Sequence, residues 1–256
     1  HVGAKYHDRQ NIKNKKYFNK FKKIVTGAKI KSLERRGKNI SINLNNGYSI
    51  IVHMKMTGNL MYGLYPDNKF IHLIFNLSDH KNLSLADMRK FASVTFCKTA
   101  ELHLHDTVGK LGPDPLDPGF SAKKLFEILH TKSAPIKSAL LDQSVLTGIG
   151  NIYSDEILWQ TSIHPLYGAN KIPEIKFKEI FRVMQRILKF SIAQGGDSKS
   201  DYRNAFGGKG GFQDFHKVYG KKGEICPKPK CGGIIERMVI KGRSAHFCPK
   251  HQLMYK

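Results

Sequence analysis

Apolar and polar residues alternate through much of the first hundred residues, which is the pattern of strands with one buried face. The clearest stretch, ISINLNNGYSIIVHM (40–54), has Asn45-Asn46-Gly47 at its centre. Asparagine and glycine tolerate the positive φ angles of tight hairpin turns, so this stretch predicts two antiparallel strands. Shorter alternating runs predict further strands at IHLIFNL (71–77), SVTFC (93–97) and ELHLH (101–105). The chain from about residue 29 to 104 is therefore predicted to be mostly β structure.

The hydrophobic period changes after LGPDPLDPGF (111–120), whose prolines and glycines predict a linker. Residues 121–130 predict a short helix, and a second is expected after a Ser133 cap, with Pro135 in its first turn and Ile136, Leu140 and Leu141 on one face. A third helix is expected to start at Asn151. A long helix is predicted from Pro173 until Gly195 ends it, with an apolar stripe formed by Phe177, Ile180, Phe181, Met184, Ile187, Leu188 and Ile192.

The charge balance narrows the class of partner. The chain has 43 Lys and Arg against 20 Asp and Glu, a formal net charge of +23. Such a field attracts polyanions, above all nucleic acids. No apolar run approaches the length of a membrane span, so a membrane partner is not expected. The composition predicts a cytoplasmic protein that binds nucleic acid.

Cysteines crowd the end of the chain in a pattern typical of a zinc site. Cys226 and Cys231 form one pair, and Cys248 and His251 form a second pair after an intervening predicted hairpin that turns at Lys241-Gly242. Four such ligands suit one tetrahedral, structural Zn²⁺. The alternative is three buried thiols and a surface histidine, but too few apolar residues surround the cysteines to form a core. We therefore expect a metal to stabilise this tail.

The segment VLTGIGNIYSDEILW (145–159) places a glycine turn directly before a predicted helix. Backbone N–H groups at a helix N-terminus attract anions, so Gly150 and Asn151 are candidate phosphate contacts. The same turn could simply relieve strain between two helices. Lys132 and Lys137, just upstream, favour the interpretation as a phosphate site.

Several motifs together resemble the formamidopyrimidine-DNA glycosylase family: HMKMTGNL, DMRKF, LGPDPL, IKSALLDQSVLTGIGNIYSDEILWQTSIHP and GRSAHFCPKHQ. The resemblance covers nearly the whole chain. It implies an α+β protein of two domains, an N-terminal β-sandwich-like domain and a C-terminal helix-two-turn-helix domain with a β-hairpin zinc finger. The expected boundaries are 1–110 for the first domain, 111–120 for the linker, 121–215 for the helical domain with a lid loop at 196–211, and 216–256 for the finger.

The same resemblance implies a DNA repair enzyme that excises oxidised purines, 8-oxoguanine and formamidopyrimidines, from duplex DNA and cleaves the abasic strand by β,δ-elimination. Lys38 matches a phosphate-contacting lysine assigned as a proton donor, and Arg243 matches a finger arginine assigned to δ-elimination. Met56, Arg89 and Phe91 match the residues that fill the space left by the extruded base. Lys132 and Asn151 match DNA contacts of the helical domain, and Lys137 matches a helix lysine nearby. Together with Gly150 of the glycine turn, these residues are expected to contact DNA. The partner is duplex DNA, bound by a monomer.

The chain also departs from the family pattern. The family's first residues are a proline, whose amine attacks the sugar, and a glutamate, whereas this chain starts HVGAKYHDRQ. We therefore expect a chain truncated at its N-terminus that binds DNA without cleaving it. The alternatives are a non-catalytic DNA-binding relative and a general zinc-containing nucleic-acid module. Phe70 stands where a DNA-contacting histidine is typical, and the zinc ligands depart from the usual four cysteines.

Overall fold

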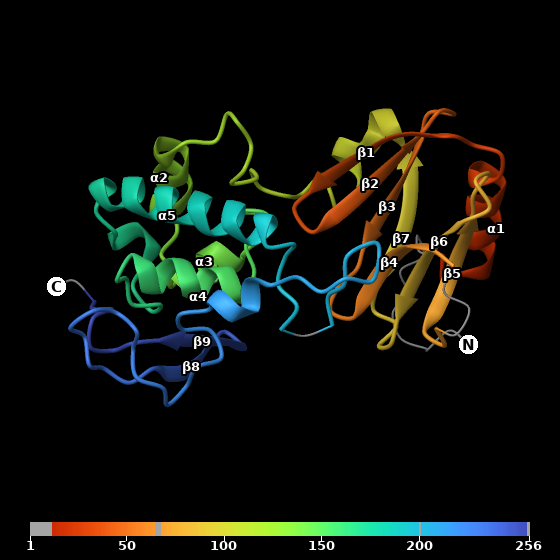
Figure 1. Cartoon of the computed structure of the whole chain (residues 1–256). Coiled ribbons are helices and arrows are strands. Elements are labelled where there is room, and N and C mark those ends of the chain that lie inside the picture. Colours follow the sequence, from red (N-terminus) through yellow and green to blue (C-terminus); the bar gives the residue numbers. More distant parts are fainter. Residues whose placement is uncertain (1–11, 65–67, 200, 255–256) are drawn as a thin grey trace. The chain divides into compact units, whose positions relative to one another are not determined.

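The computed structural model describes residues 12–64, 68–199 and 201–254, which divide into two compact units (Figure 1). One unit contains the chain up to Lys110 together with 198–210, and the other contains 111–197 and 211–256. Residues 198–210, within the glycine-rich segment, cluster with the first unit.

The first unit contains two antiparallel sheets, as expected of a β-sandwich-like domain. The strand orders are β1-β2-β3-β7 and β4-β6-β5. The predicted hairpin at 40–54 is confirmed as β2 and β3, with Gly47 at a φ of 79° in the turn. The strands of the two sheets are β1 (Ile30–Arg36), β2 (Asn39–Leu44), β3 (Tyr48–His53) and β7 (Ser93–Lys98), and β4 (Gly58–Gly63), β5 (Ile71–Asn76) and β6 (Asn82–Asp87).

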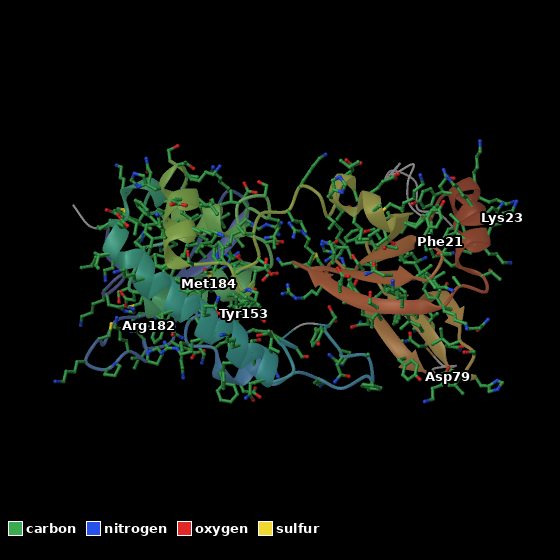
Figure 2. The ribbon with its side chains drawn as sticks, turned by 90° about the horizontal axis from the view of Figure 1, so that it is seen from above. Phe21, Lys23, Asp79, Tyr153, Arg182 and Met184 are labelled. Carbon is green, nitrogen blue, oxygen red and sulfur yellow. The ribbon has the colours of Figure 1, made fainter. Side chains whose placement is uncertain are left out.

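One apolar core joins these sheets to a helix that the sequence analysis did not predict. The helix α1 (Lys15–Val25) is capped by the Asn14 side chain, which accepts a hydrogen bond from the Tyr17 N–H at 3.1 Å. Phe21 is 1% exposed and packs among residues of both sheets. Figure 2 shows Phe21 on the sheet side of α1 and Lys23 on the opposite side. The segment contains many lysines, so its average hydrophobicity is low. Its apolar residues nevertheless recur at helical spacing and form one stripe.

The predicted strand at 101–105 is wrong. Residues Thr99–Leu104 form a 3₁₀ helix instead, and Leu104 is 72% exposed. The chain leaves β7 at Lys98 without turn residues, so a strand here would run past the end of the sheet with nothing to pair with.

The second unit is built on four α-helices around one core, in agreement with the expected helix-two-turn-helix domain. The Ser121 hydroxyl caps the first of them, accepting from the Lys124 N–H at 3.3 Å. The predicted cap at Ser133 is wrong, because Pro135 occupies the N-cap position and the helix starts at Ile136. The helices are α2 (Ala122–His130), α3 (Ile136–Leu141), α4 (Asn151–Gln160) and α5 (Glu174–Ala193).

The apolar stripe of α5 faces the core, except at its last turn. Met184 is fully buried, and Figure 2 shows it among the helices while Arg182 projects outward. Ile192, predicted to be part of the stripe, is 63% exposed. Ser191 occupies the buried position there, and its hydroxyl lies 2.8 Å from the Tyr153 hydroxyl.

The end of the chain forms the predicted hairpin, β8 (Glu236–Ile240) and β9 (Arg243–Phe247). Lys241 and Gly242 both have positive φ angles, 46° and 75°, as a tight two-residue turn requires. Among the described residues, no helix has the length and apolar character needed to cross a membrane.

Candidate nucleic-acid interface and metal centre

Met56, Arg89 and Phe91 lie together on the surface of the first unit. Met56 is in the turn before β4, and the other two are in the turn between β6 and β7. The Arg89 guanidinium lies 4.8 Å from the centre of the Phe91 ring, and its Nη1 is 3.3 Å from the Met56 sulfur. Met56 is 62% and Phe91 is 43% exposed. Large apolar groups held at the surface beside a cation are suited to contact stacked bases.

A buried carboxylate, Asp87, fixes the turn that carries Arg89 and Phe91. Its oxygens accept the Thr57 hydroxyl proton, the Arg89 N–H at 3.1 Å and the Ala92 N–H at 2.6 Å. Burial raises the pKa of Asp87, but the hydrogen bonds from Thr57, Ala92, Arg89 and Phe91 outweigh it, so the net pKa is lowered. The sequence alone does not reveal the roles of Thr57 and Asp87, because the Thr57 hydroxyl and the carboxylate that accepts its hydrogen bond lie 30 positions apart in the chain.

Lys38 is exposed in the turn between β1 and β2, and it belongs to a cationic cluster with His53 and Lys55. Burial is the largest cause of a lowered pKa at His53, and the charges of Lys55 and Lys38 add to it, so that the pKa is about 4. The Lys55 N–H donates to His53 Nδ1 at 2.9 Å. A bound phosphate would relieve the repulsion within this cluster.

Acidification is expected to lower the free energy of unfolding because of His53. The unfolded histidine takes up a proton near its ordinary pKa of 6.5, whereas in the fold it does so only at about 4. The stability that neutral His53 contributes is therefore present above pH 6.5 and is lost as pH falls towards 4. Thermal unfolding from pH 7.5 to 4.5 should show a weaker pH dependence for His53→Gln than for the wild type. The exposed His103→Gln serves as control and should keep the wild-type slope; equal slopes in all three proteins would contradict the assignment.

In the glycine turn before α4, one of the backbone N–H groups that the sequence suggests are available to a ligand is already hydrogen-bonded within the protein. The N–H of Gly148 donates to the Gln143 side chain at 3.0 Å, and Gly148 has a φ of 88°, which requires glycine. Gly150 is the N-cap residue of α4 and no described side chain caps that end. Gly150 and Asn151 therefore stay candidates for an anion contact, whereas Gly148 does not.

Lys137 is not a surface residue, and its expected contact with DNA is corrected by the structure. Its side chain is 0% exposed, and Nζ forms an ion pair with the Asp155 carboxylate. The other oxygen of Asp155 accepts the N–H and the Nδ1–H of His246, at 2.9 and 3.0 Å. Lys137, Asp155 and His246 thus form a buried network that connects α3, α4 and β9. Burial lowers the pKa of Lys137, and the negative charge of Asp155 opposes this effect.

The other predicted contact residues lie at the surface. Lys132 is exposed after α2, and Arg243 is exposed at the start of β9, beside the hairpin turn. Phe70 is 37% exposed, and the ammonium of Lys69 lies 5.5 Å from its ring centre.

The four predicted zinc ligands converge on one point, with all ligand atoms within 4.8 Å of one another. Sγ of Cys231 is 3.6 Å from Sγ of Cys248 and 3.5 Å from Nδ1 of His251. A tetrahedral zinc ion requires about 3.8 Å between sulfurs and about 3.5 Å from sulfur to nitrogen. The residues therefore fit one structural zinc ion, as the sequence predicts.

Trp159 of α4 supports this centre, because it packs in one apolar cluster with Cys226, Cys231 and Cys248. Its indole N–H points to Cys226 Sγ at 3.4 Å, and its carbonyl oxygen lies 3.2 Å from His251 Nε2. When His251 Nε2–H donates to that carbonyl, Nδ1 is left free of a proton and available to the metal. The sequence does not reveal this role, since Trp159 is 67 residues from Cys226.

Comparisons with known proteins agree with these features. Family models match three segments: the formamidopyrimidine-DNA glycosylase N-terminal domain at 2–94, the H2TH domain of the same family at 111–203, and the zinc finger found in FPG and IleRS at 223–250. The chain is 38% identical to the formamidopyrimidine-DNA glycosylase of Desulfitobacterium hafniense over 90% of its length and 84% of the relative's. It is 37% identical to the Lactobacillus acidophilus protein of that name, covering 92% of this chain and 86% of that protein.

Solved structures give the same result. The Lactococcus lactis Fpg in complex with DNA containing an abasic site matches with a TM-score of 0.85 and 32% identity, over 96% of this chain and 89% of that one. A variant of that enzyme with DNA containing Fapy-dG matches with a TM-score of 0.84 and 33% identity, over 92% and 86% of the two chains. On identity, coverage and fold together, the chain belongs to the formamidopyrimidine-DNA glycosylase family.

Proposed function

We propose that this chain supplies the DNA-recognition machinery of a glycosylase and abasic-site lyase that acts on oxidised purines in duplex DNA. The observation that carries the proposal is the surface cluster of Met56, Arg89 and Phe91, held in place by Asp87. Phe91 wedges into the base stack, Arg89 contacts the base left without its partner, and Met56 occupies the vacated space. The clustering of these three side chains supports that assignment, since a purely structural role needs no exposed methionine and phenylalanine beside an arginine.

Phosphate contacts complete the proposed interface. Lys38 contacts a phosphate and donates a proton during β-elimination, and Arg243 contacts phosphates and assists δ-elimination. Lys132, Gly150 and Asn151 bind the backbone from the helical domain. Such a protein acts as a monomer in the compartment that holds the DNA, the cytoplasm, in association with the nucleoid.

DNA-binding measurements test the proposal. The wild type is expected to bind a duplex carrying a tetrahydrofuran abasic analogue opposite cytosine at least about tenfold more tightly than the undamaged duplex at equal salt. Arg89→Ala should lose the preference for the base opposite the lesion while retaining affinity for undamaged DNA. Equal affinity for damaged and undamaged duplex would reject the glycosylase assignment.

Arg243→Ala is expected to weaken binding to damaged and undamaged duplexes to a similar degree. A phosphate contact carries no sequence information, and its loss should reduce the slope of log K against log salt by about 1. Fluorescence anisotropy at several salt concentrations measures both quantities. Lys221→Ala is the matched control, because Glu224 already neutralises that lysine at 3.0 Å. An unchanged salt slope for Arg243→Ala would remove Arg243 from the interface.

A further inference from the structure

The two ends of the glycine-rich loop (198–210) meet in the second unit. Gly195 and Gly196, with φ angles of 74° and 94°, follow α5 and lead the chain into the loop. The segment after the loop is hydrogen-bonded to the segment before it: the Gly211 N–H donates to the Gln194 carbonyl at 2.8 Å and the Phe212 N–H donates to the Gly196 carbonyl at 3.0 Å. The loop therefore has a defined base.

A buried acid–histidine pair closes this base. Asp197 is the last residue before the loop, and its carboxylate forms a hydrogen bond with His216 Nε2. The two side chains are only 7% and 1% exposed. His216 Nδ1 is buried and has no hydrogen-bond partner among the described residues. A proton on Nδ1 would be unsatisfied, so the proton belongs on Nε2, which donates to the charged carboxylate.

His216 is itself held rigidly. The N–H groups of the next three residues, Lys217, Val218 and Tyr219, all donate to the buried carboxylate of Glu156 in α4, at 2.9 to 3.0 Å. The imidazole lies between the rings of Phe212 and Tyr219, at 5.4 and 5.5 Å between centres. The His216 ring is therefore held in one position, and its hydrogen bond in turn holds the Asp197 carboxylate.

The middle of the loop packs within the first unit. The Arg203 N–H donates to the Asn59 side chain at 3.0 Å, and the Tyr62 N–H donates to the Ala205 carbonyl at 2.7 Å. Asp201 and Arg203 line a cavity of about 220 Å³ in that unit, together with Thr57, Asn59, Asn68, Phe70, Ala86, Asp87 and Met88. The loop continues directly from its base, so loss of the contacts that hold the base is expected to loosen the loop as well.

We propose that Asp197 and His216 are positioning residues for the glycine-rich loop. The pair fixes where the chain enters and leaves the loop, and so restrains residues 198–210, which include Asp201 and Arg203. If the loop covers the extruded base, as the proposed function implies, loss of the pair weakens binding to lesion-containing DNA more than binding to undamaged DNA. This second consequence rests on the proposed function, whereas the ordering of the loop does not.

Hydrogen exchange measured by mass spectrometry on the whole chain tests the ordering directly. His216→Leu keeps the bulk between the two rings but removes the donor, and it should raise amide exchange in 198–210 about tenfold or more. Asp197→Asn keeps an acceptor for Nε2–H and should exchange like the wild type. Phe215→Leu alters the neighbouring side chain, which packs on Phe190 at 4.9 Å and takes no part in the pair, so it should leave the loop unchanged.

The outcomes separate the two parts of the proposal. Equal loop exchange in the wild type and His216→Leu would overturn it, and so would a rise of the same size in Phe215→Leu or throughout the helical core. Affinity for a tetrahydrofuran duplex and for undamaged DNA is then measured on the same proteins. If His216→Leu raises exchange in the loop but leaves the ratio of affinities for the tetrahydrofuran duplex and undamaged DNA unchanged, the role of the pair in lesion binding is overturned. A wild type without preference for the lesion would reject the proposed function instead, and the exchange result would still decide the role of the pair.

Discussion

Asp155→Ala is expected to reduce the free energy of unfolding by about 3–5 kcal/mol, the range found when one member of a buried ion pair is removed. The substitution leaves the fully buried ammonium of Lys137 without its countercharge and deprives His246 of the acceptor for two N–H groups. Denaturant unfolding followed by circular dichroism measures the change. Because the network connects α3, α4 and β9, the helices and the finger should lose stability together.

An exposed ion pair provides the control. Lys123 and Glu127 lie 4.0 Å apart on α2, and their side chains are 82% and 55% exposed. Glu127→Ala should change the free energy of unfolding by less than about 1 kcal/mol. A similar small effect for Asp155→Ala would show that Lys137 releases its proton and becomes neutral at little cost when the carboxylate is removed.

Removal of zinc is expected to unfold the finger while the helical core remains folded. Apparent binding energies of about 10–16 kcal/mol at such sites are folding energy for the residues around them. The small apolar cluster at the finger consists of three metal-binding cysteines, Val218, Ile235 and Trp159 of α4. Cys248→Ser should abolish stoichiometric zinc binding, and affinity for DNA should fall about tenfold or more as the position of Arg243 becomes undefined. Zinc content after acid release, and DNA affinity before and after chelation, measure both effects.

Trp159 gives an independent signal for the same event. It is the single tryptophan of the chain, and its indole N–H points to Cys226 Sγ. Its fluorescence spectrum should shift when zinc is removed and recover when zinc is restored. His251→Cys is the conservative variant and should retain zinc, since tetrahedral sites accept four thiolates. An unchanged spectrum in protein shown to be free of zinc would contradict a structural role for the metal.

Local patterns in the sequence were enough to predict much of the fold. The hairpin around Gly47 and the finger hairpin at Lys241-Gly242 follow from turn residues that tolerate positive φ, which is a property of a few adjacent residues. The zinc ligands follow from the spacing of soft donors in a segment too poor in apolar residues to fold alone. The family resemblance added the cluster of Met56, Arg89 and Phe91, whose members are up to 35 positions apart in the numbering of the chain.

Pairing between distant residues could not be predicted in the same way. The sequence shows Lys137 as one more cation near a glycine turn, and only the tertiary structure places Asp155 beside it in the interior. The alternating segment at 101–105 is not a strand because no neighbouring strand is available to pair with it. Helices and turns can be predicted from residues that are adjacent in the chain. The burial of a side chain and the pairing of a strand depend instead on which elements the fold brings together. The sequence by itself therefore determined the two hairpins, the helices of the second unit, the metal ligands and the class of partner, but not α1 or the 3₁₀ helix at Thr99–Leu104. The tertiary structure decided which charges are buried, which carboxylates hold the turns, and how the base of the glycine-rich loop is closed by Asp197 and His216, because each depends on how the folded chain brings side chains together.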